Sequence, residues 1–280
     1  GDWAVRRPRL APGGWAFEFA NDNYPDIDDT AEVVLALRRA ATGSPGATDA
    51  ACRRAVTWTL GMQSRGGGWG AFDVDNTSEL CVALPFCDFG AVIDPPTADV
   101  TAHMVEMLAA EPGVDPAVVA RALTWLSEEQ EADGSWFGRW GANYVYGTGA
   151  AVPALVAAGV SSGDRRIRRA VGWLEGHQNP DGGWGEDLRS YVDDAWRGRG
   201  ASTPSQTAWA LLALLAAGEH DSDAVTDGVR YLVETQTAEG TWDEPLFTGT
   251  GFPGYFYINY HLYRLVFPVM ALGRYLGGHG

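Results

Sequence analysis

The chain has 280 residues, of which 46% are hydrophobic, enough for a packed core in one large domain or two small ones. Its formal charge is −16 and its basic residues are scattered, so nucleic acid and anionic lipid surfaces are poor electrostatic partners. All 20 basic residues are arginine, which excludes lysine-dependent chemistry such as a Schiff base or a P-loop lysine.

The first segment with chemical character is NYPDIDDTAEVVLAL, residues 23–37. Three aspartates, Asp26, Asp28 and Asp29, fall within four positions at the start of an apolar helix. Carboxylates this close repel one another. Metal binding, substrate ionisation, proton donation and helix capping would each explain them, and the segment by itself does not choose among these roles.

Further along the chain, two kinds of helix are predicted to alternate. Segments that are apolar on nearly every side belong in an interior, and they cover residues 28–41, 98–110, 148–159, 204–217 and 261–276. Segments that carry more charge are expected outside them, near residues 50–62, 116–129, 165–177 and 223–235. No strand pattern competes with this interpretation.

Each outer helix runs into the same short pattern. Four segments align without gaps: RAVTWTLGMQSRGGGW, RALTWLSEEQEADGSW, RAVGWLEGHQNPDGGW and DGVRYLVETQTAEGTW, ending at Trp69, Trp136, Trp184 and Trp242. In each, a Gln precedes the Trp by six residues and a Gly precedes it by two. We expect the Gly to let the backbone leave the helix, the Gln to bond nearby peptide groups and the Trp to cover them. The repeats therefore predict architecture rather than chemistry.

Alternating inner and outer helices describe an all-α fold, an α/α toroid or double-layer helical barrel. Residues 1–280 are expected to form one such domain. Five inner and four outer helices fall short of the roughly twelve that a closed barrel with six per layer would need. The toroid is therefore predicted to be incomplete without upstream helices, and the first residue, Gly1, leaves room for a natural N-terminus upstream.

The three cysteines, Cys52, Cys81 and Cys87, have no CxxC spacing. A disulfide framework or a structural zinc site is therefore poorly supported, and buried inert thiols are expected. The longest weakly polar stretch, about residues 145–160, is too short to span a bilayer. No signal peptide is visible.

Several motifs together resemble one enzyme family. The repeat is similar to the QW motif of triterpene cyclases, and DIDDTA resembles the DxDDTA motif of squalene–hopene cyclases. The resemblance extends over nearly the whole chain, through PFCDFG, DPPTADVTAH, DGSWFGRWG and GTGFPGYFYINYHLYRLVFP. Oxidosqualene cyclases, which open an epoxide, typically carry DCTAE at this place. DIDD is therefore more typical of an enzyme that protonates a plain alkene.

The resemblance implies a class II terpene cyclase that protonates a terminal alkene of squalene, or of a similar linear isoprenoid, to start a cationic polycyclisation. It implies no cofactor and no metal. It also implies a second helical barrel, inserted upstream in the family and absent from this chain, or a partner chain in its place. The family is peripheral to one membrane leaflet, so a cytoplasmic, monotopic location is expected. The net charge makes any such contact hydrophobic rather than electrostatic.

The resemblance also assigns roles to acidic residues. Asp28 would be the proton donor, with Asp26 and Asp29 as its flanking carboxylates. Crowding and burial favour the neutral acid, while a helix N-terminus and a cationic donor stabilise the carboxylate left behind. Asp99 and His103, at i and i+4, share one helix face. The resemblance implies that His103 bonds the catalytic aspartate and that Asp99 orients His103.

Cationic intermediates need a dry cavity of negative potential that offers no nucleophile, and aromatic ring faces supply one. Residues that match the family's lining are Phe17, Phe72, Trp140, Tyr146, Phe252, Phe256, Tyr260 and Tyr263, with Phe86, Phe89 and Tyr257 as weaker candidates. The alternative is that these rings are simply core. Position 72 is often Tyr in the family, and its Phe in this chain is expected to shift the product distribution.

Three other interpretations stay open. Asp28, Asp29 and Glu32 spell DDxxE, as in metal-dependent terpene synthases, but the second motif of that class is imperfect because Ala102 stands where a hydroxyl belongs. A prenyltransferase-like toroid would bind zinc through a cysteine, and no cysteine is in a comparable setting. The chain could also be a non-catalytic fragment, or a subunit that needs a partner chain for activity.

Overall fold

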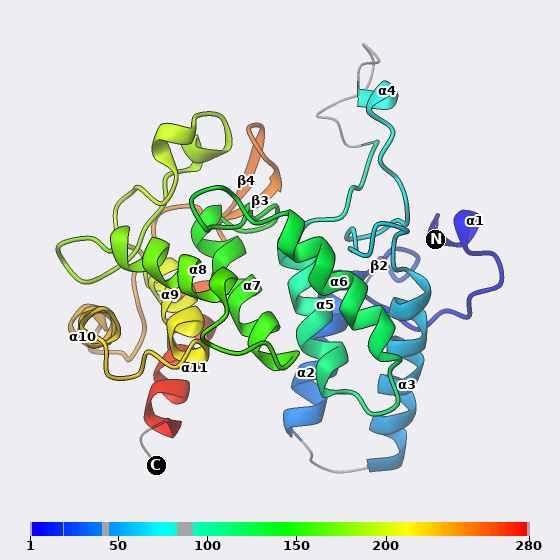
Figure 1. Ribbon diagram of the computed structural model, residues 1–280, viewed down its shortest axis with the longest axis horizontal. Helices are drawn as coiled ribbons and strands as arrows, with labels where there is room; N and C mark the ends of the chain where they lie inside the picture. Colours follow the sequence, from blue (N-terminus) through cyan, green and yellow to red (C-terminus); the bar gives the residue numbers. More distant parts are fainter. Residues whose placement is uncertain (1, 19, 41–44, 83–91, 279–280) are drawn as a thin grey trace. The chain divides into compact units, whose positions relative to one another are not determined.

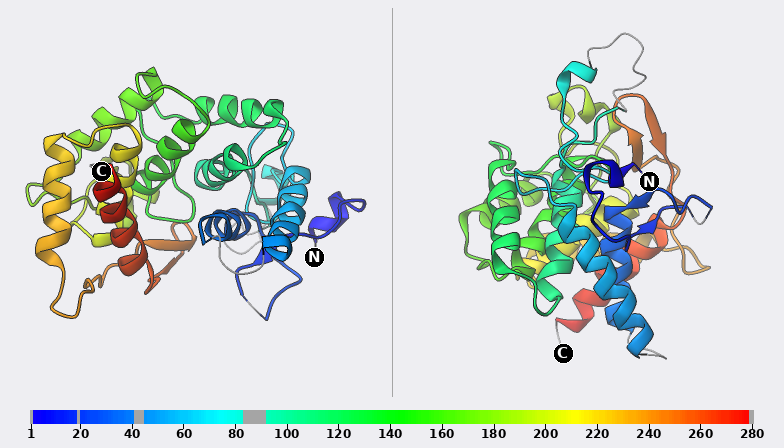
Figure 2. Two further views of the ribbon diagram at one scale, coloured as in Figure 1. Left: turned by 90° about the horizontal axis from the view of Figure 1, so that it is seen from below. Right: turned by 90° about the vertical axis from the view of Figure 1, so that its right-hand side faces the viewer.

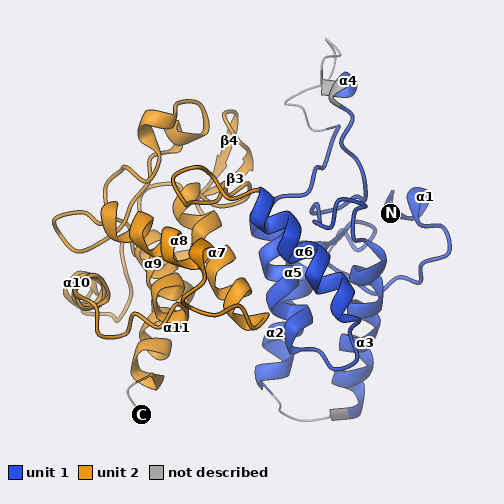
Figure 3. Cartoon of the chain, viewed as in Figure 1, with its two compact units in different colours: residues 1–128 blue, residues 129–280 orange. Residues whose placement is uncertain are grey.

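A computed structural model describes residues 2–18, 20–40, 45–82 and 92–278 (Figure 1). Phe86, Cys87 and Phe89 lie outside the described residues. The chain divides into two units, residues 1–128 and residues 129–280, which are coloured separately in Figure 3. That residues 1–280 form a single domain stays a prediction.

All nine predicted helices are present in the described ranges. The predicted inner helices are α2 (Ile27–Ala40), α5 (Ala98–Ala110), α7 (Tyr144–Ala157), α9 (Pro204–Ala216) and α11 (Tyr263–Gly277). The predicted outer helices are α3 (Pro45–Gly61), α6 (Pro116–Glu128), α8 (Arg165–Gly176) and α10 (Asp223–Thr235). Among the described residues, no helix is both long enough and apolar enough to cross a bilayer.

The structure also contains short elements that the sequence patterns did not indicate. They are the helices α1 (Trp3–Arg6), α4 (Glu79–Val82), η2 (Leu188–Tyr191) and η3 (Asp194–Trp196), and the strands β1 (Trp15–Ala16), β2 (Pro25–Asp26), β3 (Gly249–Phe252) and β4 (Phe256–Ile258). β1 pairs with β2 and β3 with β4, both antiparallel. Strands this short carry no detectable alternation of polar and apolar residues, and they leave the all-α interpretation unchanged.

In the first unit, α5 packs against both α2 and α6, and α2 also packs against α3. Figures 1 and 2 show α2 and α5 side by side. Ile27 and Val34 of α2 and Val100 and Met104 of α5 are buried. This apolar contact brings the helix that begins with the aspartates against the helix that carries His103.

In the second unit, α9 is the central helix, since it packs against α7, α8, α10 and α11. Both α7 and α9 are buried over nearly their whole length, as predicted for inner helices. Helix α11 is buried on one side only. Pro268 and Ala271 are buried, as predicted for an inner helix, whereas Val269 and Leu276 are exposed.

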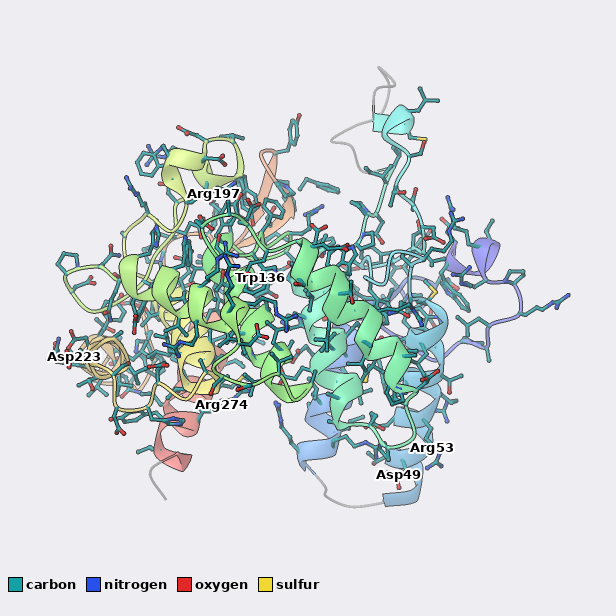
Figure 4. All side chains as sticks on the ribbon, viewed as in Figure 1. Asp49, Arg53, Trp136, Arg197, Asp223 and Arg274 are labelled. Carbon is teal, nitrogen blue, oxygen red and sulfur yellow. The ribbon has the colours of Figure 1, made fainter. Side chains whose placement is uncertain are left out.

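The four repeats fold as the sequence predicts. In each, the Gln side chain donates a hydrogen bond to the carbonyl of the Gly four residues later, at 2.8–3.1 Å. These glycines have φ between 80° and 107°, a conformation that other residues rarely adopt. The repeat tryptophans are almost completely buried; Trp136 is labelled in Figure 4. Trp69, Trp184 and Trp242 donate Nε1–H to a carbonyl ten residues earlier, at 2.8 Å.

The repeats also connect successive outer helices. The Gln178 side chain donates a second hydrogen bond, of 2.9 Å, to the carbonyl of Ala224 in α10. A Cβ atom at Gly182 would lie 2.6 Å from the carbonyl oxygen of Asp227 in the same helix. The pattern therefore fixes how closely one repeat approaches the next, which is an architectural role.

Candidate active site

The acidic segment forms the start of α2, directly after β2. Asp26 Oδ1 accepts hydrogen bonds from the backbone N–H groups of Asp28 and Asp29, at 2.7 and 3.1 Å. These donors have no partner within the first turn of a helix, so Asp26 acts as its cap. The Thr30 hydroxyl bonds the Asp26 carbonyl at 2.5 Å and also accepts from the backbone N–H of Trp15 in β1. Local bonds thus hold the backbone of all three aspartates.

Asp28 contacts His103, 75 residues away in the sequence. The distance between His103 Nδ1 and Asp28 Oδ1 is 2.6 Å, and the two side chains are 15% and 22% exposed. The contact that the resemblance implied between these side chains is therefore present. Within the described residues, no hydrogen bond is formed by Asp28 Oδ2. His103 thus contacts only one of the two carboxyl oxygens.

The charges around His103 favour its protonated form. Burial by itself lowers the pKa of His103, but the charge of Asp28, the hydrogen bond to it, and the charges of Glu32 and Asp99 together raise that pKa from 6.5 to about 10. Asp99 is fully buried one turn earlier on α5 and accepts a hydrogen bond from the backbone of Val100. While Asp28 is ionised, His103 is therefore an imidazolium near neutral pH, and it donates its Nδ1 proton to the Asp28 carboxylate.

The other two aspartates have raised pKa values. Burial, together with the charges of Asp28 and Asp29, raises the pKa of Asp26 well above 3.8, although the backbone bonds to its carboxyl act in the opposite direction. Burial and the charges of Asp28 and Glu32 raise the pKa of Asp29 to about 6. Asp29 Oδ2 is buried with no hydrogen-bond partner in the described part of the chain. A neutral carboxyl tolerates that position better than a carboxylate does.

Three of the predicted lining residues belong to one group of rings in the second unit. The rings of Tyr260 and Tyr263 are 4.7 Å apart between centroids. Trp209 of α9 lies 4.7 Å from Tyr146 and 5.8 Å from Tyr263, and Phe267 lies 5.4 Å from Trp209. Trp209 and Phe267 were not predicted as site residues, because in the sequence they are apolar members of apolar helices.

Two further predicted residues, Trp140 and Phe252, share a cation within the protein. The Arg139 guanidinium lies 4.3 Å from the Trp140 ring centroid and 5.8 Å from that of Phe252. Both rings thus already interact with a positive charge. Tyr257 lies 6.2 Å from the ring of Tyr191, and its hydroxyl accepts a hydrogen bond from the backbone of Gly254.

The remaining predicted lining residues are less enclosed. Phe17 and Phe256 are 59% and 54% exposed. Phe72 is half-buried, and its backbone N–H donates to Asp94 at 2.6 Å. Phe17 and Phe72 belong to the first unit and the other predicted rings to the second, so their lining roles stay predictions.

The sequence is similar to that of several named proteins. Residues 1–277 match the family model described as the squalene–hopene cyclase C-terminal domain. The squalene–hopene cyclase of Alicyclobacillus acidocaldarius is 58% identical over 277 residues, which cover 98% of this chain and 44% of that protein. The squalene–hopene cyclase of Zymomonas mobilis is 51% identical over 281 residues, covering 98% and 42%. The chain thus spans less than half the length of the relatives it matches.

Solved structures show a similar fold. A variant of the type II terpene cyclase MstE from Scytonema, in complex with merosterolic acid A, aligns with a TM-score of 0.67 at 19% identity, covering 99% of this chain and 80% of that one. The ent-copalyl diphosphate synthase from Streptomyces platensis aligns with a TM-score of 0.59 at 22% identity, covering 99% and 44%. At these identities the likeness shows the fold alone. It confirms the predicted fold class, the α/α toroid of class II terpene cyclases.

Proposed function

Because this chain belongs to the squalene–hopene cyclase family, we propose that it supplies the acid for a cationic polycyclisation, with Asp28 protonating a terminal alkene of squalene or of a similar linear isoprenoid. The observation that supports this most directly is the 2.6 Å contact between Asp28 and His103. The imidazole contacts one oxygen of a carboxyl whose other oxygen can hold the reacting proton, and the carboxylate that proton transfer leaves behind would itself favour the protonated form of His103.

In the proposed initiation step, the alkene π electrons take the proton from Asp28 Oδ2. A C–H bond forms, the O–H electron pair stays on the carboxylate, and a carbocation is left on the substrate. The His103 imidazolium stabilises that carboxylate through its charge-assisted hydrogen bond. The raised pKa values of Asp26 and Asp29 reduce the negative charge on these neighbours that would oppose its formation. Asp99 would act by keeping His103 charged.

The later cations would be stabilised by aromatic faces. Tyr146, Tyr260 and Tyr263 support this part of the proposal, because they already form one group of neutral rings with Trp209. A neutral ring can attract a substrate cation without supplying a nucleophile. Trp140 and Phe252, which face Arg139, would serve more in shaping a cavity than in binding charge.

We propose two partners beyond the substrate. Because the matched relatives are more than twice as long as the match, a second helical barrel or a partner chain would complete the site. A hydrophobic contact with one membrane leaflet, from the cytoplasmic side, would deliver the apolar substrate. The formal charge of −16 disfavours an electrostatic attachment to anionic lipid.

The test uses squalene with two proteins: the chain itself, and a chimera in which the chain replaces the matching segment of the Alicyclobacillus relative. Products are identified by gas chromatography with mass spectrometry. We expect cyclised products that fall by at least about 100-fold in Asp28→Asn, since an amide cannot donate the proton. The control is Asp115→Asn, which changes an exposed carboxylate at the start of α6 and should leave turnover unchanged.

Several outcomes would contradict the proposal. A well-folded Asp28→Asn variant that retains turnover would remove the assigned acid. Loss of turnover in EDTA, restored by magnesium, would favour a metal-dependent terpene synthase. If the chimera makes no product while the unaltered relative does, the chain is better described as a non-catalytic fragment or as a subunit of another assembly.

A further inference from the structure

Trp209 contacts three aromatic rings that belong to two neighbouring helices. Its ring centroid lies 4.7 Å from that of Tyr146 in α7, at an interplanar angle of 62°. In α11 it lies 5.8 Å from Tyr263 and 5.4 Å from Phe267, at 80° and 75°. Steep angles at these distances are favourable aromatic geometries, so one indole contacts rings from both α7 and α11.

The backbone around Trp209 leaves little room for the indole to move. Trp209 is 3% exposed, and α7 approaches α9 closely at Gly149. A Cβ atom at Gly149 would lie 2.9 Å from Trp209 Cβ, closer than real Cβ contacts allow. Gly149 is three residues after Tyr146 and therefore on the same helix face. The close approach at Gly149 thus holds the Tyr146 ring against the indole.

Hydrogen bonding does not account for an indole at this place. In the described residues, the buried Nε1–H of Trp209 has no hydrogen-bond partner. Trp184, which is equally enclosed, donates its Nε1–H to the carbonyl of Leu174 at 2.8 Å. An unpaired buried donor is unfavourable, and a Phe or Leu would avoid it. The size of the indole and the directions of its edges are what distinguish it from those residues.

We propose that Trp209 is a positioning residue that sets the orientations of the Tyr146 and Tyr263 side-chain rings. It thereby determines how many product rings close before the substrate cation loses a proton. The inference rests on the proposed function, in which these tyrosines face substrate cations. A ring attracts a cation over its face and not at its edge, so a ring that turns loses that attraction. The substrate cation that the tyrosine ring had stabilised would then lose a proton before the next product ring closes.

The test is Trp209→Phe, made in the chimera and in the chain. No hydrogen bond is lost in this variant, so its effect reports ring size and orientation. We expect the ratio of incompletely cyclised to fully cyclised products to rise by about 2- to 30-fold, the range of a lost cation–π contact. Total squalene consumption should fall much less than in Asp28→Asn. Gly149→Ala, which presses on the indole from α7, should change the product ratio in the same direction.

The matched control is Trp184→Phe, which loses a hydrogen bond at similar burial, and within the described residues the Trp184 ring has no aromatic contact with either tyrosine. It should lower the melting temperature and leave the product ratio unchanged. Turnover by Trp209→Phe with an unaltered product ratio would overturn the inference.

A second measurement does not depend on catalysis, so it separates this inference from the proposed function. Ring-flip rates of Tyr146 and Tyr263 can be measured by NMR with ring-labelled tyrosine. They should increase in Trp209→Phe and stay unchanged in Trp184→Phe. Equal flip rates in the wild-type chain and in Trp209→Phe would overturn the positioning role even if the chain proves catalytic.

Discussion

Replacing Asp28 by Asn should lower the pKa of His103 by several pH units. Burial lowers that pKa, and the largest opposing contribution is the charge of Asp28, which with its hydrogen bond helps raise the value from 6.5 to about 10. The rise corresponds to at most about 5 kcal/mol in favour of the imidazolium. Without the carboxylate, burial dominates, so we expect His103 in Asp28→Asn to titrate near or below 6.5.

The same shift predicts how stability depends on pH. The pKa of His103 is higher in the folded chain than in the unfolded chain, so its stabilising contribution is fully present below about pH 6.5. It is lost as the pH rises through about 10. The wild-type chain should therefore become easier to unfold in urea between pH 7 and 10, and Asp28→Asn should show a much smaller change over that range.

Both results can be measured on one set of samples. Two-dimensional NMR of ¹⁵N-labelled imidazoles follows the titration of His103, and urea midpoints at several pH values follow stability. Asp99→Asn serves as the comparison, since the charge of Asp99 contributes less to the shift than that of Asp28. If His103 still titrates near pH 10 in Asp28→Asn, the charge of Asp28 is not what keeps the imidazole protonated. The proposal that the two side chains stabilise each other electrostatically would then be wrong.

Two further predictions concern stability. Gly182→Ala should destabilise the chain by more than about 1 kcal/mol in thermal or urea unfolding, because φ is +87° there and the new Cβ would meet the Asp227 carbonyl. Gly172→Ala, in α8 with open space around it, should instead stabilise by roughly 0.5–1 kcal/mol, and similar effects at the two sites would contradict the packing argument. Burial raises the pKa of Glu186 from 4.5 to about 7 in the folded chain. The contribution of Glu186 to the free energy of unfolding is therefore fully present below about pH 4.5 and is lost as the pH rises through about 7. Between pH 5 and 8 the wild type should lose up to about 3 kcal/mol of unfolding free energy and Glu186→Gln should not; a parallel loss in both would show that another group titrates.

Much of the scaffold follows from the sequence because its determinants are local. The Gln and Gly of each repeat are four residues apart, and their hydrogen bond closes within one turn after the helix. The apolar and charged helices are likewise distinguished by composition alone. The sequence misplaces a helix boundary where a residue distant in the chain bonds to the backbone. α7 starts at Tyr144 rather than near 148 because Glu186 accepts a hydrogen bond from the backbone N–H of Val145, at 2.8 Å.

The candidate site divides in the same way. The sequence by itself placed three aspartates at a helix start and put Asp99 and His103 on one helix face, since both patterns depend on spacing along one segment. It left several roles open for the aspartates, and a family resemblance, rather than spacing, joined His103 to Asp28. Only tertiary structure decided which oxygen His103 contacts, which aspartates have raised pKa values, and that Trp209 connects Tyr146 to Tyr263. Those features depend on burial and on which helices pack together, and neither is encoded in any single stretch of the chain.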